Sequence, residues 1–250
     1  ALSPADACDF ARHCAALDFW SINDHANGLY PEDWRNTVDA IRECNARSGD
    51  AQNPDTVAFL GWEWTQAGLT PGEHYGHKNV VLAHTDDKRI PTRPIAAKQG
   101  GLLMQSASPF VRGGLALVDD RFSDLSRRIA DYTDAPYCGA GHVRELDPNC
   151  REVATTPPEL FRKLDEWGHD AIVIPHGTAW GVYTPPGSSW SKQLKGVMHD
   201  SDRQTLLEVY SGHGDSEVYR DWRAVSTNAN GDLICPEERT NYLPPCRQAG

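Results

Sequence analysis

The sequence predicts an α/β protein with a sheet of parallel strands. Two observations lead to this prediction. Short apolar runs alternate with helical segments whose apolar residues share one face. Polar side chains able to do chemistry directly follow several of these apolar runs. Since the carboxyl ends of parallel strands face the functional crevice while strand middles are buried, we expect the functional site at these strand ends.

The first strand–helix–strand unit lies near the N-terminus. Residues 3–16 predict a helix that has Ser3 as its N-cap. An apolar strand over 17–22 follows, then a helix over 31–47 with its apolar residues on one face, then a strand over 56–64. Two strands joined by a helix form the unit of a parallel sheet or barrel.

The rest of the chain continues this alternation with longer interruptions. Further strands are expected at 77–82, 170–175 and 205–210. Helices are expected at 121–132, from Thr155 or Thr156 to Gly168, and at 215–224. The segments without periodicity are interpreted as loops, at 85–120, 133–153, 178–195 and 226–250.

The composition limits both the architecture and the partners. A chain of 250 residues can form one large domain or two small ones, and a single domain over 1–250 is predicted. No apolar stretch reaches the length of a transmembrane helix. The net charge of −11 argues against nucleic acids and anionic membranes as partners, because clusters of lysine and arginine bind their phosphates. A small phosphorylated substrate stays compatible, because bound metal ions supply local positive charge.

Seven cysteines are present without a C-x-x-C spacing, which argues against a structural zinc knuckle. Cys138 with Cys150, and Cys235 with Cys246, lie in loops at spacings that allow disulfides. Reduced, partly buried thiols are the alternative. Disulfides in these pairs would favour a periplasmic or secreted protein, because the cytosol keeps thiols reduced.

Histidine and glutamate side chains beside predicted strands are candidate ligands of a divalent metal ion. His25, Glu63 and His176 follow apolar runs, and His77 precedes one. Imidazole and carboxylate groups are suitable ligands for Zn, Mn or Fe. One isolated histidine would more often be a surface or core residue, so the recurrence at strand ends is the informative feature. His74 is the alternative to His77, which is favoured by its place at the strand start.

Five motifs resemble a bacterial family of uncharacterised proteins in the PHP (polymerase and histidinol phosphatase) superfamily. They are D-F-W-S-I-N-D-H-A, F-L-G-W-E-W-T, H-Y-G-H-K-N-V-V, V-I-P-H-G and L-L-E-V-Y-S-G-H-G-D-S-E. Their order makes them jointly specific, and the resemblance extends over nearly the whole chain. The resemblance implies a distorted (β/α)7 barrel with two or three metal ions at the C-terminal ends of its strands. Many proteins of the superfamily hydrolyse phosphoesters. By motif it implies His25, Glu63, His77 and His176 as metal ligands.

Two motifs expected from the resemblance are absent. PHP proteins begin with an H-x-H strand and end with a D-x-H motif, and this chain contains neither. The resemblance therefore implies an internal segment of a longer protein, with an incomplete barrel and long loop insertions. The resemblance thus implies weak metal binding by such a segment and leaves open whether it is active by itself.

Asp24 and His213 are expected to assist the metal ligands. Asp24 is expected to orient His25 or a bound water. Helix capping is an equally good use for its carboxylate. His213 follows a strand motif typical of the family, and it would either bind metal or protonate the leaving group.

Three further residues are candidate substrate contacts. Lys78 and Arg144 are candidates for binding a phosphate, with surface salt bridges as the alternative use. Trp180 lies in a loop rich in aromatic residues and proline that would suit an apolar group of the substrate.

The leading functional hypothesis is a metal-dependent hydrolase of phosphoesters that uses metal-activated water. One alternative keeps the metal chemistry and changes the substrate to an amide, a lactone or a sulfate ester. Another is a non-catalytic binding module that has kept the barrel and lost the metal site.

Overall fold

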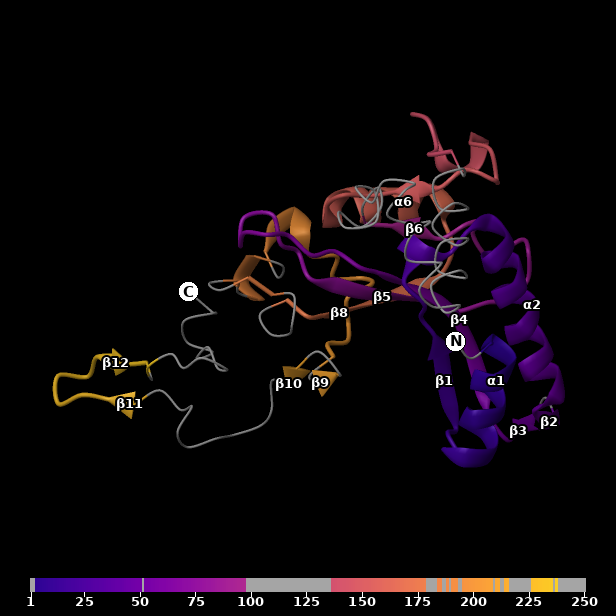
Figure 1. Cartoon of the computed structure of the whole chain (residues 1–250), viewed down its shortest axis with the longest axis horizontal. Helices are drawn as coiled ribbons and strands as arrows, with labels where there is room; N and C mark the ends of the chain where they lie inside the picture. The colour runs from indigo at the N-terminus through magenta and orange to yellow at the C-terminus, as the bar shows by residue number, and fades with distance from the viewer. Residues whose placement is uncertain are drawn as a thin grey trace, which may run out of the picture.

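A four-stranded mixed sheet lies at the centre of the computed structural model of this chain (Figure 1). Its strands, in spatial order, are β1 (Phe19–Ile22), β4 (Val57–Trp64), β5 (His77–Leu82) and β8 (Ala171–His176). β1 pairs in parallel with β4, whereas β5 is antiparallel to both of its neighbours. Three strands therefore run in one direction and β5 runs in the other.

The structure describes most of the chain in several stretches. These are residues 3–50, 52–97, 136–178, 184–185, 188, 190–192, 195–208, 210–211, 214–215, 226–235 and 237. The helix predicted at 121–132 lies outside the described residues, as do residues 216–224 of the helix predicted at 215–224. So do Trp180, His213 and the part of the predicted loop over 98–120.

The prediction that all strands are parallel is wrong at β5. The connection from β4 to β5, residues 65–76, contains turns and no helix, so the chain returns beside β4 in the opposite direction. β1 and β4 are instead joined through α2 (Pro31–Arg47), and they form the predicted parallel pair. The described strands form an open sheet and do not close into a barrel.

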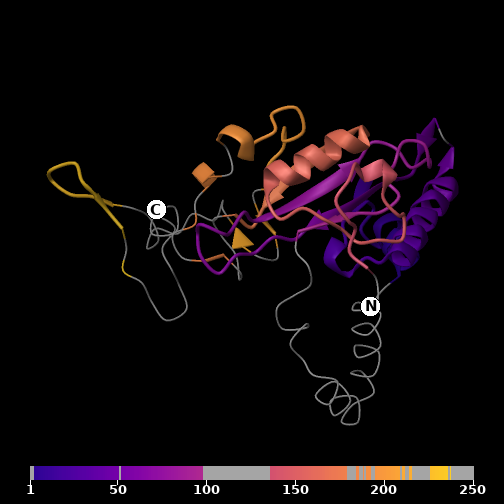
Figure 2. The ribbon, with the colours of Figure 1, turned by 90° about the horizontal axis from the view of Figure 1, so that it is seen from above.

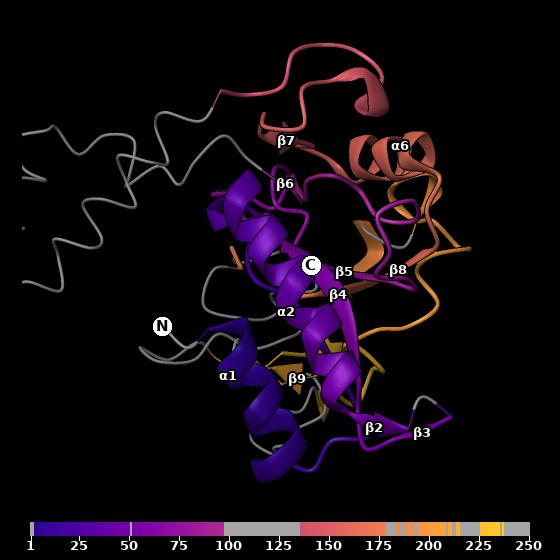
Figure 3. The ribbon, with the colours of Figure 1, turned by 90° about the vertical axis from the view of Figure 1, so that its right-hand side faces the viewer.

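Among the described residues, three helices flank this sheet, and each begins with proline at its first position. α1 (Pro4–Asp9) continues into a π-helical turn, Phe10–Cys14, and Ser3 caps it as predicted. α6 (Pro157–Trp167) ends at Gly168, which has a left-handed conformation with φ of +63°. Figures 2 and 3 show α2 beside β4, and α6 alongside β5 and β8.

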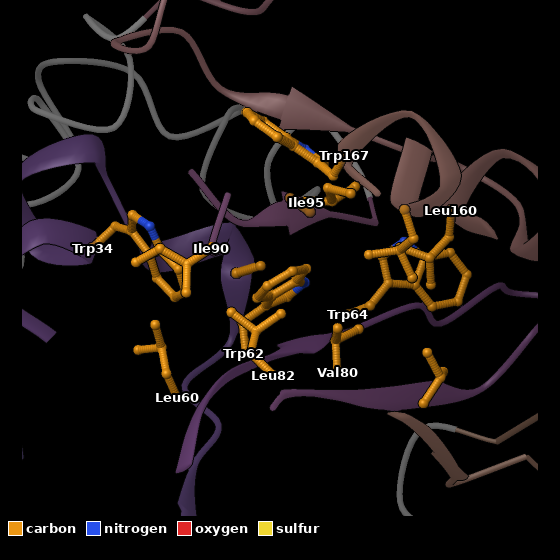
Figure 4. Close-up of a cluster of buried hydrophobic side chains, with 14 of the residues drawn as sticks. Trp34, Leu60, Trp62, Trp64, Val80, Leu82, Ile90, Ile95, Leu160 and Trp167 are labelled. Atoms are coloured by element: carbon orange, nitrogen blue, oxygen red, sulfur yellow. The ribbon is translucent and has the colours of Figure 1, made fainter. Parts of the chain in front are cut away.

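The hydrophobic core lies between one face of the sheet and these helices (Figure 4). Alternate residues of the strands point into it: Leu60, Trp62 and Trp64 from β4, Val80 and Leu82 from β5, and Val173 from β8. Trp34 of α2 packs edge-to-face on Trp62, with ring centroids 5.7 Å apart. The indole nitrogen of Trp34 donates a hydrogen bond to the Pro91 carbonyl over 3.0 Å.

The intervening strand residues point to the opposite face of the sheet. Gly61, Glu63, His77, Asn79 and His176 belong to this set, because the side-chain period of a strand is two. The same strands that form the core therefore place a polar cluster on the face that α2 and α6 do not cover.

Residues 205–208 do not form the strand predicted over 205–210. They run beside β8, where the Val173 amide donates to the Arg203 carbonyl and the Glu208 amide donates to the Pro175 carbonyl. Only β9 (Tyr210–Ser211) is a strand within the described part of this range, and it pairs with β10 (Gly214–Asp215).

Short ladders and 3-10 turns complete the described structure. The ladders pair β2 (Gly49–Asp50) with β3 (Asn53–Pro54), β6 (Ile95–Ala96) with β7 (Glu152–Val153), and β11 (Ser226–Thr227) with β12 (Leu233–Ile234). The 3-10 turns are Ala26–Gly28, Val143–Glu145, Trp190–Lys192 and Gly196–Met198. The last ladder is a hairpin inside 226–250, a segment that was predicted to be irregular.

Two disulfides have both of their cysteines among the described residues. The predicted Cys138–Cys150 bond is present. Cys8 of α1 is bonded to Cys44 of α2, a pairing that the sequence did not predict. Cys235 is also disulfide-bonded, and its predicted partner lies outside the described residues. The two described bonds are compatible with an extracellular location.

None of the described helices combines the length and the apolar character that crossing a membrane requires.

Gly61 allows β4 and β5 to approach closely. A β-carbon at this position would lie 2.4 Å from the Val80 carbonyl oxygen and 3.1 Å from Nδ2 of Asn23. That Asn23 amide donates to the Trp62 and Val80 carbonyls over 3.2 and 3.4 Å, which fastens β1 across β4 to β5.

We therefore expect Gly61→Ala to lower the free energy of unfolding by about 3 kcal/mol, because backbone atoms must move apart. Gly28→Ala is the matched control, since nothing lies within 4 Å of its β-carbon position. The control should change stability by less than about 1 kcal/mol. Urea denaturation measures both variants, and equal stabilities would contradict this account of the β4–β5 approach.

Candidate metal centre

The register of three strands brings Glu63, His77 and His176 together. In the β4–β5 ladder Glu63 is paired with Asn79, so His77 lies diagonally across from Glu63. In the β5–β8 ladder His77 is paired directly with His176. Because β5 is antiparallel, its first residue meets the last residues of the neighbouring strands at one edge of the sheet.

The geometry of these three residues fits a single divalent ion. Nδ1 of His77 lies 2.8 Å from Oε1 of Glu63, and Nε2 of His176 lies 3.7 Å from Oε2 of the same carboxylate. One ligand atom from each residue falls within 4.8 Å of the others. Ligands of a tetrahedral ion, bound at about 2.0–2.1 Å, are about 3.4 Å apart, and the two observed distances bracket this value.

Burial and charge make the cluster attractive to a cation. Glu63, His77 and His176 are 8%, 3% and 4% exposed. Burial alone would raise the pKa of Glu63, but the imidazoles of His176, His25 and His77 around the carboxylate outweigh burial and lower that pKa well below its ordinary value. The carboxylate is therefore ionised at neutral pH inside a largely water-excluded site.

His25 lies at the rim of the cluster and is not part of the three-residue group. Its side chain is 59% exposed, and its Nδ1 lies 3.2 Å from Oε1 of Glu63. The same nitrogen is 2.5 Å from Oγ1 of Thr65, whose hydroxyl donates to Glu63. Since that hydroxyl has one proton to donate, it accepts from His25, which places a proton on Nδ1. Hydrogen bonding to the Glu63 carboxylate raises the pKa of His25.

Sequence reasoning did not identify Thr65 as a residue of this site. It follows Glu63 by two positions, so the alternation of a strand predicts it on the same face. The spacing of two residues from Glu63 could therefore have identified Thr65 from the sequence.

Glu208 was also missed, although its segment was recognised. Its Oε2 lies 3.7 Å from Nδ1 of His176, and it accepts a hydrogen bond of 3.2 Å from Nδ2 of Asn79. The available signal was a carboxylate in an otherwise apolar run, L-L-E-V-Y.

The structure brings His77 to the cluster and gives His74 a different role. Nδ1 of His74 accepts a hydrogen bond from the Gly68 amide, so Nε2 carries the proton and donates to the Gly177 carbonyl over 3.1 Å. Burial lowers the pKa of His74 to about 4. A neutral ring with both nitrogens engaged fastens the loop before β5 to the end of β8.

Lys78 is not brought to the cluster, because it follows His77 by one residue and points to the other face. It is buried in the core, where Nζ donates to the Tyr75 carbonyl over 3.1 Å and lies 5.1 Å from the Trp64 ring. Burial lowers the pKa of Lys78 to about 7.

Arg144 and Asp24 also have structural contacts. The Arg144 guanidinium donates to the Glu166 and Trp167 carbonyls at the end of α6, a structural use in place of the phosphate contact expected from the sequence. Asp24 is exposed, and its carbonyl accepts from the Glu63 amide over 2.9 Å. It therefore holds the backbone of Glu63 in place.

Replacing Lys78 by methionine tests its buried position. The unfolded chain, in which lysine titrates near pH 10.4, binds more protons than the folded protein between about pH 7 and pH 10. The free energy of unfolding of the wild type should therefore rise with pH across this window. We expect Lys78→Met to reduce this rise and to stabilise the protein at pH 7 by on the order of 2 kcal/mol.

Urea denaturation at both ends of the window measures this effect. The exposed Lys88→Met is the control, and it should keep the pH dependence of the wild type. An unchanged pH dependence in Lys78→Met would contradict the assignment of a buried lysine whose pKa is lowered by burial.

The described site thus consists of a buried carboxylate and two buried imidazoles, with His25 and Thr65 at the rim and Asn79 and Glu208 behind His176. This group could hold a metal ion. No family model, no curated protein and no solved structure matches the chain.

Proposed function

We propose that this protein is a metal-dependent hydrolase, with phosphoesters as its leading substrate class. The observation that carries the proposal is the buried cluster of Glu63, His77 and His176. Two histidines and one carboxylate leave a fourth position of a tetrahedral ion open, which is the arrangement of catalytic rather than structural zinc sites. When bound, a Zn, Mn or Fe ion would activate a water molecule and polarise the bond to be cleaved.

The protein's own residues have distinct roles in this proposal. Glu63 supplies the negative charge that holds the cation, and Thr65 donates a hydrogen bond that fixes the carboxylate. His25 is exposed and has its Nδ1 engaged by Thr65 and Glu63. In its neutral form Nε2 is therefore the nitrogen that can take up a proton at the mouth of the site.

The resemblance to PHP proteins supports a small phosphorylated substrate and two or three ions. The described residues contain one three-residue group that could hold an ion, so further ions remain an expectation. Hydrolysis of a non-phosphate ester or an amide is the second candidate. It is favoured by the positions of Lys78, in the core, and Arg144, at the end of α6, because both lie away from the cluster.

Metal binding is the first measurement. Dialysis against Zn²⁺ or Mn²⁺ followed by elemental analysis should find at least one ion bound per wild-type chain. His77→Ala and Glu63→Gln should weaken binding by more than about 100-fold, beyond the loss typical of an outer-shell partner. His13→Ala, which removes an exposed histidine, is the control and should bind like the wild type.

Activity is tested on chromogenic phosphomonoesters, phosphodiesters and carboxylic esters with the same ions. We expect metal-dependent release from a phosphoester, lost in His77→Ala and kept in His13→Ala. Cleavage of carboxylic esters alone would support the second candidate. A chain that binds no ion and cleaves no ester would contradict both and leave the non-catalytic binding module.

The affinity for the ion should depend on pH with a defined sign. Imidazole binds metal in its neutral form, so protons compete with the ion for histidine ligands as the pH falls through the acidic range. Glu63, whose pKa is lowered, stays ionised across this range. We expect the affinity to fall by up to about 100-fold per pH unit in the wild type, and by about 10-fold in His176→Ala. Isothermal titration calorimetry measures both slopes, and a pH-independent affinity would argue against histidine ligands.

A further inference from the structure

We propose that Glu208 and Asn79 are positioning residues of the metal centre. Asn79 orients the Glu208 carboxylate, which stabilises a proton on Nδ1 of His176 and so presents Nε2 to the ion. This inference rests on the metal-binding part of the proposed function and does not depend on the substrate.

His176 lies between two carboxylates that approach different ring nitrogens. Nε2 is 3.7 Å from Oε2 of Glu63, and Nδ1 is 3.7 Å from Oε2 of Glu208. Only 5% of the His176 side chain is exposed, and its ring meets that of His77 edge-to-face with centroids 5.4 Å apart. The packing therefore fixes which nitrogen faces which carboxylate.

The Glu208 carboxylate is held from two directions. Its Oε2 accepts a hydrogen bond of 3.2 Å from Nδ2 of Asn79, and its backbone amide donates to the Pro175 carbonyl, next to His176. Asn79 follows His77 by two residues on β5, so the two side chains share a face. One strand thus supplies both a candidate ligand and the group that orients the carboxylate behind the second histidine.

The chemistry of a ligating histidine explains the use of this arrangement. A neutral imidazole carries one proton, and the nitrogen without it is the one that binds metal. A carboxylate facing the protonated nitrogen fixes the tautomer, holds the ring and increases the basicity of the other nitrogen. Glu208, 26% exposed, lies at the border of the buried cluster, where the Coulomb interaction with a proton on Nδ1 is stronger than in bulk water.

The test compares Glu208→Gln, Glu208→Ala and Asn79→Ala with the control Asp202→Asn. Asp202 is an exposed carboxylate in the same segment. Chelator competition should show Zn²⁺ binding weakened about 10- to 100-fold in Glu208→Ala, less in Glu208→Gln and Asn79→Ala, and unchanged in the control. Thermal melts verify that each variant is folded.

A second readout separates positioning from a purely structural role. Long-range ¹H–¹⁵N spectra of the histidine rings identify the protonated nitrogen directly. In the ion-free wild type at about pH 9, where histidine is neutral, we expect the proton of His176 on Nδ1. It should move toward Nε2, the preferred position in a solvent-exposed histidine side chain, in the folded Glu208→Gln variant.

Each result decides between the alternatives. A His176 proton on Nε2 in the wild type, or the same tautomer in wild type and Glu208→Gln, would overturn the positioning role. Zn²⁺ affinity unchanged in all three variants would also overturn it. A wild type that binds no Zn²⁺ at pH 7–8 would instead refute the proposed function, and the ion-free spectrum would still show whether Glu208 controls the tautomer.

Discussion

The antiparallel register of β5 between β4 and β8 is the constraint on which the rest of the structure depends. It pairs Glu63 with Asn79 and His77 with His176, so that side chains far apart in the sequence share one corner of the sheet. The same register places Trp64 and Lys78 on the opposite face. Because the side-chain period is two, a slip of one residue would exchange these sets and bury the charged cluster in the core. Core packing and site geometry are thus specified by the same hydrogen bonds.

Local chemistry in the sequence was sufficient to predict most of the elements. The prolines that begin the helices, the Ser3 cap and Gly168 at the end of α6 are signals within a few residues of where they act. Strand direction is different, because it depends on the connection between strands. The segment from 65 to 76 is long enough to join two parallel strands. It would have to cross over the sheet to do so, usually as a helix, and it forms turns instead. The Cys8–Cys44 bond was missed for a similar reason, since it depends on how α1 packs on α2.

Part of the candidate site followed from the residues themselves. Glu63 and His176 were expected at strand ends, and the structure places them there with His77. His77 reaches this edge because β5 is antiparallel, whereas the prediction assumed parallel strands. Residue type alone was misleading for Lys78. A lysine beside a candidate histidine ligand suggested a phosphate contact, but the alternation of side chains along β5 places Lys78 in the core. Glu208 enters through an irregular segment, whose side-chain directions no periodicity predicts.

The central claim is that one ion is shared by Glu63, His77 and His176. Anomalous diffraction from crystals soaked with Zn²⁺ tests it most directly. The account predicts a single strong peak at this corner of the sheet, at about 2.0–2.2 Å from a carboxylate oxygen of Glu63 and from one nitrogen of each histidine. A zinc ion bound elsewhere, with no ion between these three side chains, would contradict it.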